Sequence, residues 1–283
     1  ESLQKKIAKI LSTCDEVIEK TEEAIAKYEA VKKGMMHDLF TRGIDVETGK
    51  LRPKYEDAPE LYKESELGMI PKEWEVCCIK DVCMVKGGKR LPAGEEFSNS
   101  PTEFPYIRVS DMKNGSVETS DLVFVKPEIE PIIRNYKISS NDLYITIAGT
   151  LGNVGVIPQS LDQAQLTENA AKLVIADNQV DKEYLLYFFQ SPLYYPQLFR
   201  EIGVGGGVPK LALHRIEGMS VPRLSNKEQL IIKAKAKTVD TLIRTEKLEL
   251  AKMFQIKSGL MQDLLTGNVE VKVDQEKMEL DEA

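Results

Sequence analysis

Two stretches of this chain, about 225 residues apart, follow one heptad pattern, the first over Ile7–Thr41 and the second over Ile232–Thr266. Laid side by side, they share identical residues in step: Gln4 with Gln229, Ile7 with Ile232, Asp15 with Asp240, Ile18 with Ile243, Lys32 with Lys257, Gly34 with Gly259, Met36 with Met261, Asp38 with Asp263, Leu39 with Leu264 and Thr41 with Thr266. Mostly apolar residues recur in alternating steps of four and three, which is the a/d repeat of a coiled coil.

The predicted seam also coincides between the two copies. In the first copy it reads Ile7, Leu11, Cys14, Ile18, Thr21, Ile25, Tyr28, Lys32, Met35 and Leu39. In the second it reads Ile232, Ala236, Val239, Ile243, Glu246, Leu250, Met253, Lys257, Leu260 and Leu264. Its polar positions are open to two interpretations: solvated sites near helix ends, or residues that set register or leave a face for partner helices. The pattern predicts two matched helices around one large insert.

The composition places the chain among ordinary globular proteins. Its 283 residues suffice for one domain and two long helices, and 42% hydrophobic residues argue against general disorder. No apolar run approaches the roughly 18 residues of a membrane span, and the charged start does not resemble a signal peptide. Cys14, Cys77, Cys78 and Cys83 follow neither a disulfide framework nor a zinc spacing. We therefore expect free thiols in the cytoplasm, no membrane partner, no metal and no cofactor.

The net charge of −7 argues against a strongly basic nucleic-acid-binding surface. The segment 268–283 holds two lysines against six acids, and residues 66–223 hold sixteen basic against twenty acidic residues. If the insert binds DNA, it does so through a local patch, or a partner supplies much of the phosphate contact.

The insert reads mostly as strands. Pro105–Ser110 and Asp142–Ala148 alternate, and Asn114-Gly115 is a hairpin-turn signal. Lys182–Phe199 looks helical and aromatic; a core role is favoured there over a base-stacking platform. Trp74, the sole tryptophan, is expected to be a core anchor, and Ser225 with Glu228 is expected to form a capping box for the second helix.

Catalytic motifs are missing where an enzyme would carry them. The glycines at 203–207 do not fit G-x-G-x-x-G, no phosphate-loop pattern exists, and His37 and His214 lie in different segments. The Asn-Pro-Pro-aromatic motif of amino-methyltransferases is absent, and Asp111 and Glu168 are isolated acids. The sequence therefore favours a binder or adaptor over an enzyme.

Several motifs resemble the specificity (S) subunits of type I restriction-modification systems. Pro222–Ile232 resembles the entry to that family's conserved helix, P-x-x-x-E-Q-x-x-I, here with one extra residue after the proline, and Glu1–Leu11 resembles a truncated copy. The helix ends Lys33–Gly43 and Ser258–Gly267 resemble its exit. Ile70–Trp74 resembles the start of a target-recognition domain, and the internal blocks are Lys86–Arg90, Tyr106–Asp111 and Gly149–Gly155.

The resemblance implies an α+β chain in which two long helices pair as an antiparallel coiled coil around a β-rich target-recognition domain. Its implied segments are residues 1–43 (first helix), 44–65 (linker), 66–225 (recognition domain), 226–267 (second helix) and 268–283 (acidic tail). About 34 helical residues make a rod on the order of 50 Å, about one and a half turns of B-DNA. The resemblance further implies that the domain reads one DNA half-site, that methyltransferase (M) subunits dock on the helices and that restriction (R) subunits are recruited indirectly.

Family members commonly alternate two recognition domains with two helices, whereas this chain has one domain and begins at Glu1 inside the first motif. Two interpretations stay open: a fragment of a longer subunit, or a half-length subunit that works as a pair, which would make a homodimer through the helices. The half-length or trimmed form is slightly favoured.

The candidate DNA contacts lie in glycine-rich loops or at strand ends, where backbone can approach phosphate. Arg and Asn can read guanine and adenine, and Lys mostly holds phosphate. The candidates are Lys86, Lys89, Arg90, Arg108, Ser110, Lys113, Asn114, Thr150, Asn153, Lys210, His214 and Arg215. The rival hypothesis is a coiled-coil adaptor whose insert binds protein or carbohydrate; the negative charge favours it and the family-like helix ends disfavour it.

Overall fold

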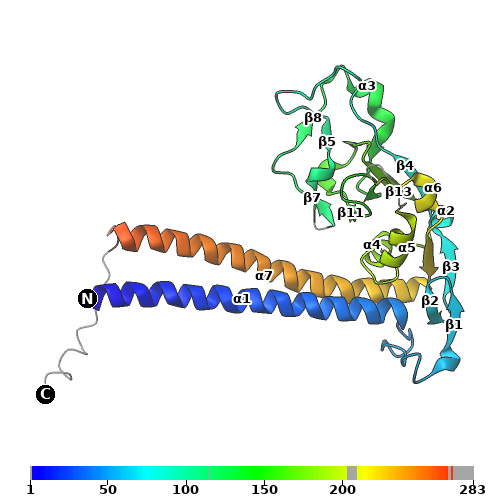
Figure 1. Ribbon diagram of the computed structural model, residues 1–283, viewed down its shortest axis with the longest axis horizontal. Helices are drawn as coiled ribbons and strands as arrows, with labels where there is room; N and C mark the ends of the chain where they lie inside the picture. The colour runs from blue at the N-terminus through cyan, green and yellow to red at the C-terminus, as the bar shows by residue number, and fades with distance from the viewer. Residues whose placement is uncertain (1, 114, 203–208, 267–268, 270–283) are drawn as a thin grey trace. The chain divides into compact units, whose positions relative to one another are not determined.

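The computed structural model describes residues 2–113, 115–202, 209–266 and 269 (Figure 1). The chain divides into two compact units, one of residues 1–35 with 236–283 and the other of residues 36–235. Two long helices, α1 (Ser2–Thr41) and α7 (Asn226–Thr266), contribute to both units. Among the described residues, no helix combines the length and apolar composition that a membrane crossing requires.

In the first unit, α1 and α7 lie side by side and run in opposite directions (Figure 1). Lys257 pairs with Asp15, Lys247 with Glu29 at 2.7 Å and Lys32 with Asp240 at 2.6 Å, so residue numbers rise along one helix as they fall along the other. Every predicted seam position is buried or half-buried, whereas the outward positions are mostly exposed. The coiled-coil seam predicted from the heptads is confirmed, and so is the antiparallel pairing that the family resemblance implies.

The polar seam positions Lys32 and Lys257 are ion-paired across the helix pair. Lys32 meets Asp240, and Lys257 meets Asp15. The sequence repeat equates Asp15 with Asp240 and Lys32 with Lys257, so the two pairs are copies of one contact related by a local pseudo-twofold axis. Because each lysine needs its aspartate at one height, this arrangement favours the register-setting interpretation.

The second unit is built around two four-stranded sheets. One is antiparallel with strand order β11-β10-β13-β4, formed by β4 (Cys83–Gly87), β10 (Leu143–Thr146), β11 (Val154–Val156) and β13 (Ala170–Ile175). The other has the order β8-β5-β12-β9, formed by β5 (Pro105–Ile107), β8 (Val123–Phe124), β9 (Lys137–Ile138) and β12 (Ala164–Leu166), in which only β5 and β12 are parallel.

Three two-stranded antiparallel sheets complete the strands described in this unit. They pair β1 (Tyr62–Ser65) with β2 (Gly68–Pro71), β3 (Glu75–Cys78) with β14 (Ser220–Arg223), and β6 (Met112–Lys113) with β7 (Ser116–Val117). The last pair is the predicted turn at Asn114-Gly115; Gly115 has φ +73°, while Asn114 lies outside the described residues. Segment 44–65, expected to be an extended linker, carries an Ile44–Leu51 bridge, η1 (Pro59–Leu61) and strand β1.

Short helices connect the strands. They are α2 (Ile79–Val82), η2 (Val109–Asp111), α3 (Glu130–Ile133), η3 (Arg134–Tyr136), η4 (Gln159–Leu161), α4 (Lys182–Phe188), α5 (Tyr195–Glu201) and α6 (Leu213–Glu217). The predicted aromatic helix is two helices, because the backbone turns at Ser191-Pro192. Most of its aromatic residues are core, as favoured, but Tyr195 and Phe199 are exposed.

The core of the unit reaches the ends of both long helices. Phe40 at the end of α1 stacks on Tyr184 of α4, with ring centroids 5.7 Å apart. Trp74 is fully buried, as expected of a core anchor, and its indole N–H donates to Glu228 at 3.1 Å. Ser225 accepts from the Glu228 N–H at 3.3 Å, which is half of the expected capping box. The carboxylate of Glu228 instead turns inward, where it has other partners.

Candidate nucleic-acid interface

The segment Leu166–Ala170, between β12 and β13, is the point where the predicted contact segments meet. The N–H of Gly88 donates to the carbonyl of Ala170 at 3.0 Å, and that of Lys89 donates to the carbonyl of Leu166 at 2.7 Å. On the other side, the N–H of Thr167 donates to the carbonyl of Ile107 at 3.1 Å. Two strand ends, those of β4 and β5, are therefore joined to one short segment.

The first glycine-rich loop requires a glycine at position 88. A Cβ atom at this position would lie 2.1 Å from the carbonyl oxygen of Thr167, so any side chain would collide with backbone. The glycine lets the chain pass beside Thr167 and then turn, and it presents Lys89 and Arg90 to solvent immediately afterwards.

The second glycine-rich loop meets the same segment through β10. The N–H of Ile147 donates to the carbonyl of Asn169 at 2.8 Å. Gly149 and Gly152 have φ of +79° and +76°, and a side chain at Gly152 would collide with Leu198 of α5. This left-handed turn holds Thr150 and Asn153 exposed.

The third segment follows the glycine cluster at 203–207, which lies outside the described residues. Lys210 forms a β-bridge with Ala148, and the N–H of Leu211 donates to the carbonyl of Ile147 at 2.9 Å. A Cβ atom at Gly87 would lie 3.7 Å from Leu213 of α6, so this segment also approaches the end of β4. The fold thus gathers around Leu166–Ala170 four segments that are far apart in the sequence: 86–90, 107–110, 147–153 and 209–215. We call this surface the loop edge.

The candidate residues differ in how they are held. Eight are exposed and form no ion pair with the residues that the structure describes: Lys86, Lys89, Arg90, Ser110, Thr150, Asn153, Lys210 and His214. Lys89 lies over the ring of Tyr136, 5.6 Å from its centroid, and its carbonyl accepts from the hydroxyl of Tyr106 at 3.0 Å. Burial raises the pKa of that hydroxyl to about 12, so Tyr106 remains a donor. Tyr106 supports this loop, and the sequence alone did not indicate it.

Three other candidates are engaged within the protein. The Arg108 guanidinium binds Asp111 at 2.8 Å and Asp121 at 3.2 Å, and the hydrogen bond to Asp111 raises the pKa of Arg108. Lys113 pairs with Glu118 at 2.7 Å, and Arg215 donates to the carbonyl of Glu201 at 2.5 Å. Asn114 lies outside the described residues. These contacts make Arg108 a structural residue of the η2 turn, whatever else it binds.

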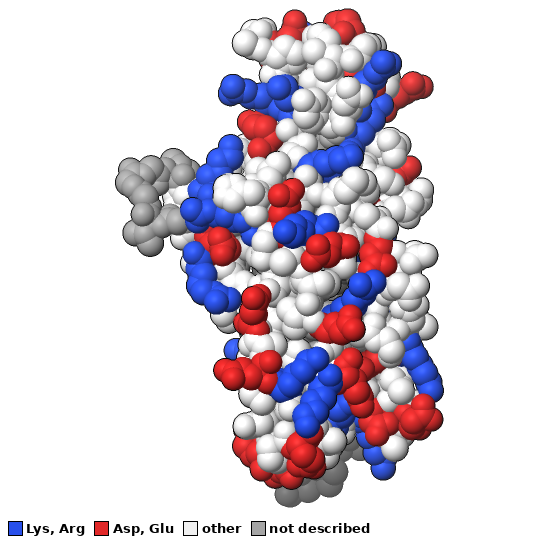
Figure 2. Space-filling view, turned by 90° about the vertical axis from the view of Figure 1, so that its right-hand side faces the viewer, with Lys and Arg blue, Asp and Glu red and all other residues white. Residues whose placement is uncertain are grey.

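The charge pattern agrees with the bulk composition. Figure 2 shows Lys and Arg side chains interspersed with Asp and Glu, so neither sign dominates the face it presents. Within the described residues, no group of three or more His, Cys, Asp or Glu side chains could hold a metal ion. All four cysteines are free thiols, and burial raises the pKa of Cys83 to about 12.

Glu228 and Gln229, at the start of α7, form a buried polar clasp that sequence reasoning missed. The carboxylate of Glu228 accepts from the N–H of Ile44 at 2.7 Å, from the Arg52 guanidinium at 2.6 Å and from the Trp74 indole. Glu228 is 2% exposed and Arg52 is 7% exposed. One carboxylate thereby joins the segment after α1 to the first strands of the insert.

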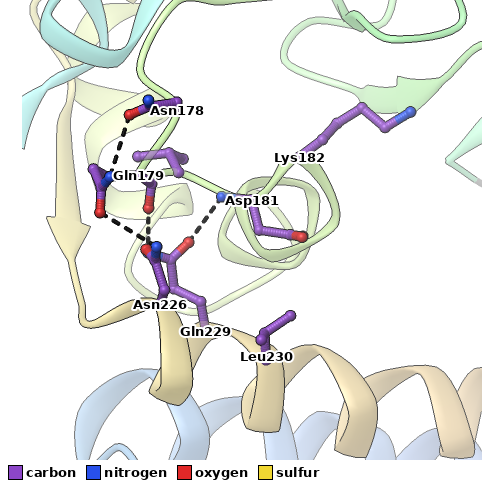
Figure 3. Close-up of a pocket in the computed structure, with 8 residues that line it drawn as sticks. Asn178, Gln179, Asp181, Lys182, Asn226, Gln229 and Leu230 are labelled. Atoms are coloured by element: carbon purple, nitrogen blue, oxygen red, sulfur yellow. Dashed lines mark hydrogen bonds between the residues drawn. The ribbon is translucent and has the colours of Figure 1, made fainter.

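Gln229 holds the other side of the clasp (Figure 3). Its amide donates to the carbonyls of Gln179 at 2.8 Å and Leu224 at 2.9 Å, and its oxygen accepts from the N–H of Asp181 at 2.9 Å. Asp181 in turn caps α4 and binds Lys233 at 2.6 Å. The Glu-Gln pair of the sequence motif is therefore the device that fixes the insert to the start of α7. The signal in the sequence that could have indicated these contacts is the adjacent polar pair Glu228-Gln229 at the start of α7, whose seam is otherwise largely apolar.

A β-rich unit whose chain enters and leaves through two antiparallel helices is a fold found in solved S subunits. The HsdS subunit from Thermoanaerobacter tengcongensis superposes with a TM-score of 0.54 at 14% identity, covering 94% of this chain and 58% of that one. A type I restriction-modification system S subunit from M. genitalium gives 0.57 at 17% identity, covering 93% and 61%.

The family model described as the type I restriction modification DNA specificity domain matches residues 71–256, so the chain belongs to this family. The type I restriction enzyme MjaVIII specificity subunit of Methanocaldococcus jannaschii is 25% identical over 273 residues, covering 95% of this chain and 60% of the relative. The putative type I restriction enzyme MjaX specificity subunit of the same organism is 24% identical over 272 residues, covering 95% of this chain and 58% of the relative. The chain thus spans about three fifths of the length of these curated relatives.

Proposed function

We propose that this chain is a non-catalytic specificity subunit that reads one half-site of a bipartite DNA sequence and carries methyltransferase subunits on its helices, with restriction subunits recruited indirectly. The observation that carries the proposal is the family match over residues 71–256, within which a single β-rich unit brings four candidate contact segments to one edge. The relatives are named as specificity subunits, which supports a role in selecting DNA rather than in modifying it.

The loop edge supports DNA reading by its chemistry. It presents Lys86, Lys89, Arg90, Lys210 and His214, which are exposed and form no ion pair within the part of the chain that the structure describes. Thr150 and Asn153 are exposed on another segment of the loop edge, and their side chains can hydrogen-bond to base edges or phosphate. With sixteen basic against twenty acidic residues in 66–223, this patch is small. We infer that a methyltransferase supplies much of the remaining phosphate contact.

The helices support the coupling role. They form a rod in which two ion pairs set the register and the antiparallel direction of the helices. One insert reads one half-site, so a bipartite site requires a second recognition domain. It would come from a longer form of the subunit or from a second copy in a homodimer.

The test is co-expression with the methyltransferase subunit of the same system, followed by sequencing of methylated positions in a randomised DNA library. We expect a defined sequence to be methylated only when this chain is present. Methylation without sequence preference, or a methyltransferase that does not co-purify with the chain, would contradict the proposal. A steep loss of DNA binding with added salt would identify phosphate contacts.

A further inference from the structure

Two aromatic side chains of α5 are exposed, although the aromatic residues packed behind them are core. Tyr195 is 47% exposed and Phe199 is 69% exposed. They stand four residues apart, so both lie on one face of the helix, and their ring centroids are 6.5 Å apart. The ring of Tyr195 lies 5.6 Å from that of the buried Tyr194, which in turn meets the buried Phe189 at 5.0 Å. Phe199 therefore stands at the solvent end of a row of rings that begins in the core.

The exposed pair lies beside the loop edge. The residues next to the pair in the sequence, Tyr194 and Leu198, support the second glycine-rich loop. The hydroxyl of Tyr194 donates to the carbonyl of Gly152 at 3.0 Å, and a side chain at Gly152 would collide with Leu198. One residue along a helix is a turn of about 100°, so the column on which that loop rests is adjacent to the column of exposed rings.

The remaining contacts of α5 fix the helix in place. Gln197 donates to the carbonyl of Ser220 at 3.0 Å and accepts from the N–H of Ser220 at 2.7 Å. The carbonyl of Glu201, at the end of α5, accepts from the guanidinium of Arg215 at 2.5 Å, which joins the helix to α6. The exposed pair is thus presented to solvent on a helix that is held by β14, by α6 and by the second glycine-rich loop.

The exposed charged side chains around the pair are basic. Arg200 of α5, with Lys210 and His214 of the loop edge, is exposed and forms no ion pair within the part of the chain that the structure describes. The acidic residues of α5 and α6, Glu201 and Glu217, are half-buried, and the second glycine-rich loop has no charged residue. This local balance is opposite to the net charge of −7. Exposed rings among basic side chains favour a nucleic acid as the occupant, because phosphates attract the cations and bases stack on the rings.

We propose that Phe199 is a wedge that enters between two adjacent base pairs beside the half-site, with Tyr195 supporting its ring and Arg200 next to a phosphate. An apolar wedge unstacks one base step and bends the duplex. The inference rests on the proposed function, in which the loop edge binds DNA, and it adds a position that is selected without a hydrogen bond to a base. Pyrimidine–purine steps unstack most easily, so DNA with such a step at the wedge is preferred.

The first test is methylation of a randomised DNA library by the complex of this chain with the methyltransferase subunit of the same system. We expect the parent to favour pyrimidine–purine steps at one place in the site. Phe199→Ala should lose this preference and show a kcat/KM about tenfold lower, while the bases specified at the other positions stay the same. Phe199→Leu should keep the preference, because leucine also acts as a wedge.

Tyr55→Ala is the matched control, since Tyr55 is an aromatic residue that is 41% exposed in the segment after α1. It should behave as the parent does in the library assay. The thermal melt of Phe199→Ala should also match the parent, because the side chain that it removes is mostly exposed.

The second test observes the unstacking itself. The adenine analogue 2-aminopurine fluoresces more strongly when it is unstacked, and it is placed in turn at each position in and beside the methylated sequence. The parent complex should raise the fluorescence at the wedge step, and the Phe199→Ala complex should not. The base that the methyltransferase extrudes for its own reaction should brighten with both complexes, which separates the two events.

The outcomes distinguish this inference from the proposed function. If the parent complex methylates without sequence preference, both fall. If the parent is specific and Phe199→Ala keeps its rate, its step preference and its fluorescence change, only the wedge falls. Loss of the methyltransferase from the Phe199→Ala chain in a pull-down would make the ring a protein contact and overturn the wedge. So would a Phe199→Leu complex as impaired as Phe199→Ala.

Discussion

At the scale of single residues, Glu228 decides how the insert is attached. Its carboxylate is the common acceptor for Ile44 and Arg52, from the segment after α1, and for Trp74, from the start of the insert. A motif glutamate at a helix start reads as a capping residue, because capping is a local rule. The partners of the Glu228 carboxylate lie more than 150 residues away in the sequence, so a local pattern does not predict which residues they are.

Glu228→Ala should strongly destabilise the second unit, because the Arg52 guanidinium stays buried without its main partner. We expect a loss of about 3–5 kcal/mol in the free energy of unfolding. The matched control is Glu73→Ala, which removes the other carboxylate that binds Arg52 but lies at the surface; its cost should be about 1 kcal/mol or less. Urea unfolding of both variants measures these changes. Equal losses in the free energy of unfolding for Glu228→Ala and Glu73→Ala would refute the proposed role of the clasp.

Substitutions of Arg90 and Arg108 should have different effects, although the sequence predicts both as DNA contacts. Arg90 is exposed, whereas Arg108 is ion-paired within the protein. Arg90→Ala should leave the melting temperature unchanged and, if Arg90 reads a base, cost about 1–3 kcal/mol at one position of the site. Arg108→Ala should lower the melting temperature, because Asp111, 5% exposed, loses its partner. A melt and a library methylation assay on each variant test this; an unaltered melt for Arg108→Ala would count against it.

Asp181 makes the clasp sensitive to acid. Burial opposes its charge, but hydrogen bonds from Lys233 and from the backbone N–H of Tyr184 and Glu183 outweigh it and hold the pKa of Asp181 below its usual value. A depressed carboxyl pKa stabilises the folded state above the unfolded pKa of about 4, and this contribution disappears as the pH falls through the folded pKa. Asp181→Asn should therefore melt below the parent at neutral pH and approach it as the pH falls through the lowered folded pKa of Asp181. Parallel melting curves across that range would exclude the effect.

At the scale of elements, the long helices could be predicted and the sheets could not. The heptad repeat depends on residues three and four apart in the sequence. All twenty seam positions could therefore be predicted from the sequence, and all are buried or half-buried. The strands were visible as short segments, but β4 pairs with β13 and β3 pairs with β14, across long intervals of chain. Those pairings bring the glycine-rich loops together. The loops were candidates from composition, and their meeting at one edge depends on a strand order that local sequence does not encode.

Ile18 and Ile243 test the helix pairing directly. They are 7% and 9% exposed, and an aspartate at either position would place an unpaired charge in the seam at a cost of about 3 kcal/mol or more. Leu248→Asp, on the outer face, should change the free energy of unfolding by about 0.5 kcal/mol or less. Chemical unfolding followed by helical circular dichroism would reveal the difference, and a seam variant that unfolds like the parent would show that the pairing is wrong.

At the scale of the whole molecule, the charge balance limits what the chain does alone. With a net charge of −7 and a small cationic patch, we expect the isolated chain to bind DNA weakly at physiological salt. Adding methyltransferase should produce sequence-specific binding, because that subunit would supply phosphate contacts. A DNase footprint of the chain with and without its partner measures this. Nanomolar, sequence-specific protection by the chain alone would contradict it.

The division between a loop-rich unit and a repeated helix pair predicts a division of labour. Arg90→Ala changes a residue of the loop edge, so it should alter or weaken the methylated sequence and leave partner assembly intact. Leu242→Asp changes the helix pair, so it should release the methyltransferase while the β-rich unit keeps its own melting transition.

Each variant is assayed twice, by pull-down of the methyltransferase and by methylation of a randomised library, with Leu248→Asp as the control for both. Because sequence choice and assembly then depend on different residues, the two losses should not coincide. An arginine variant that loses the partner, or a helix variant that shifts the methylated sequence, would show that reading and coupling share the same surface.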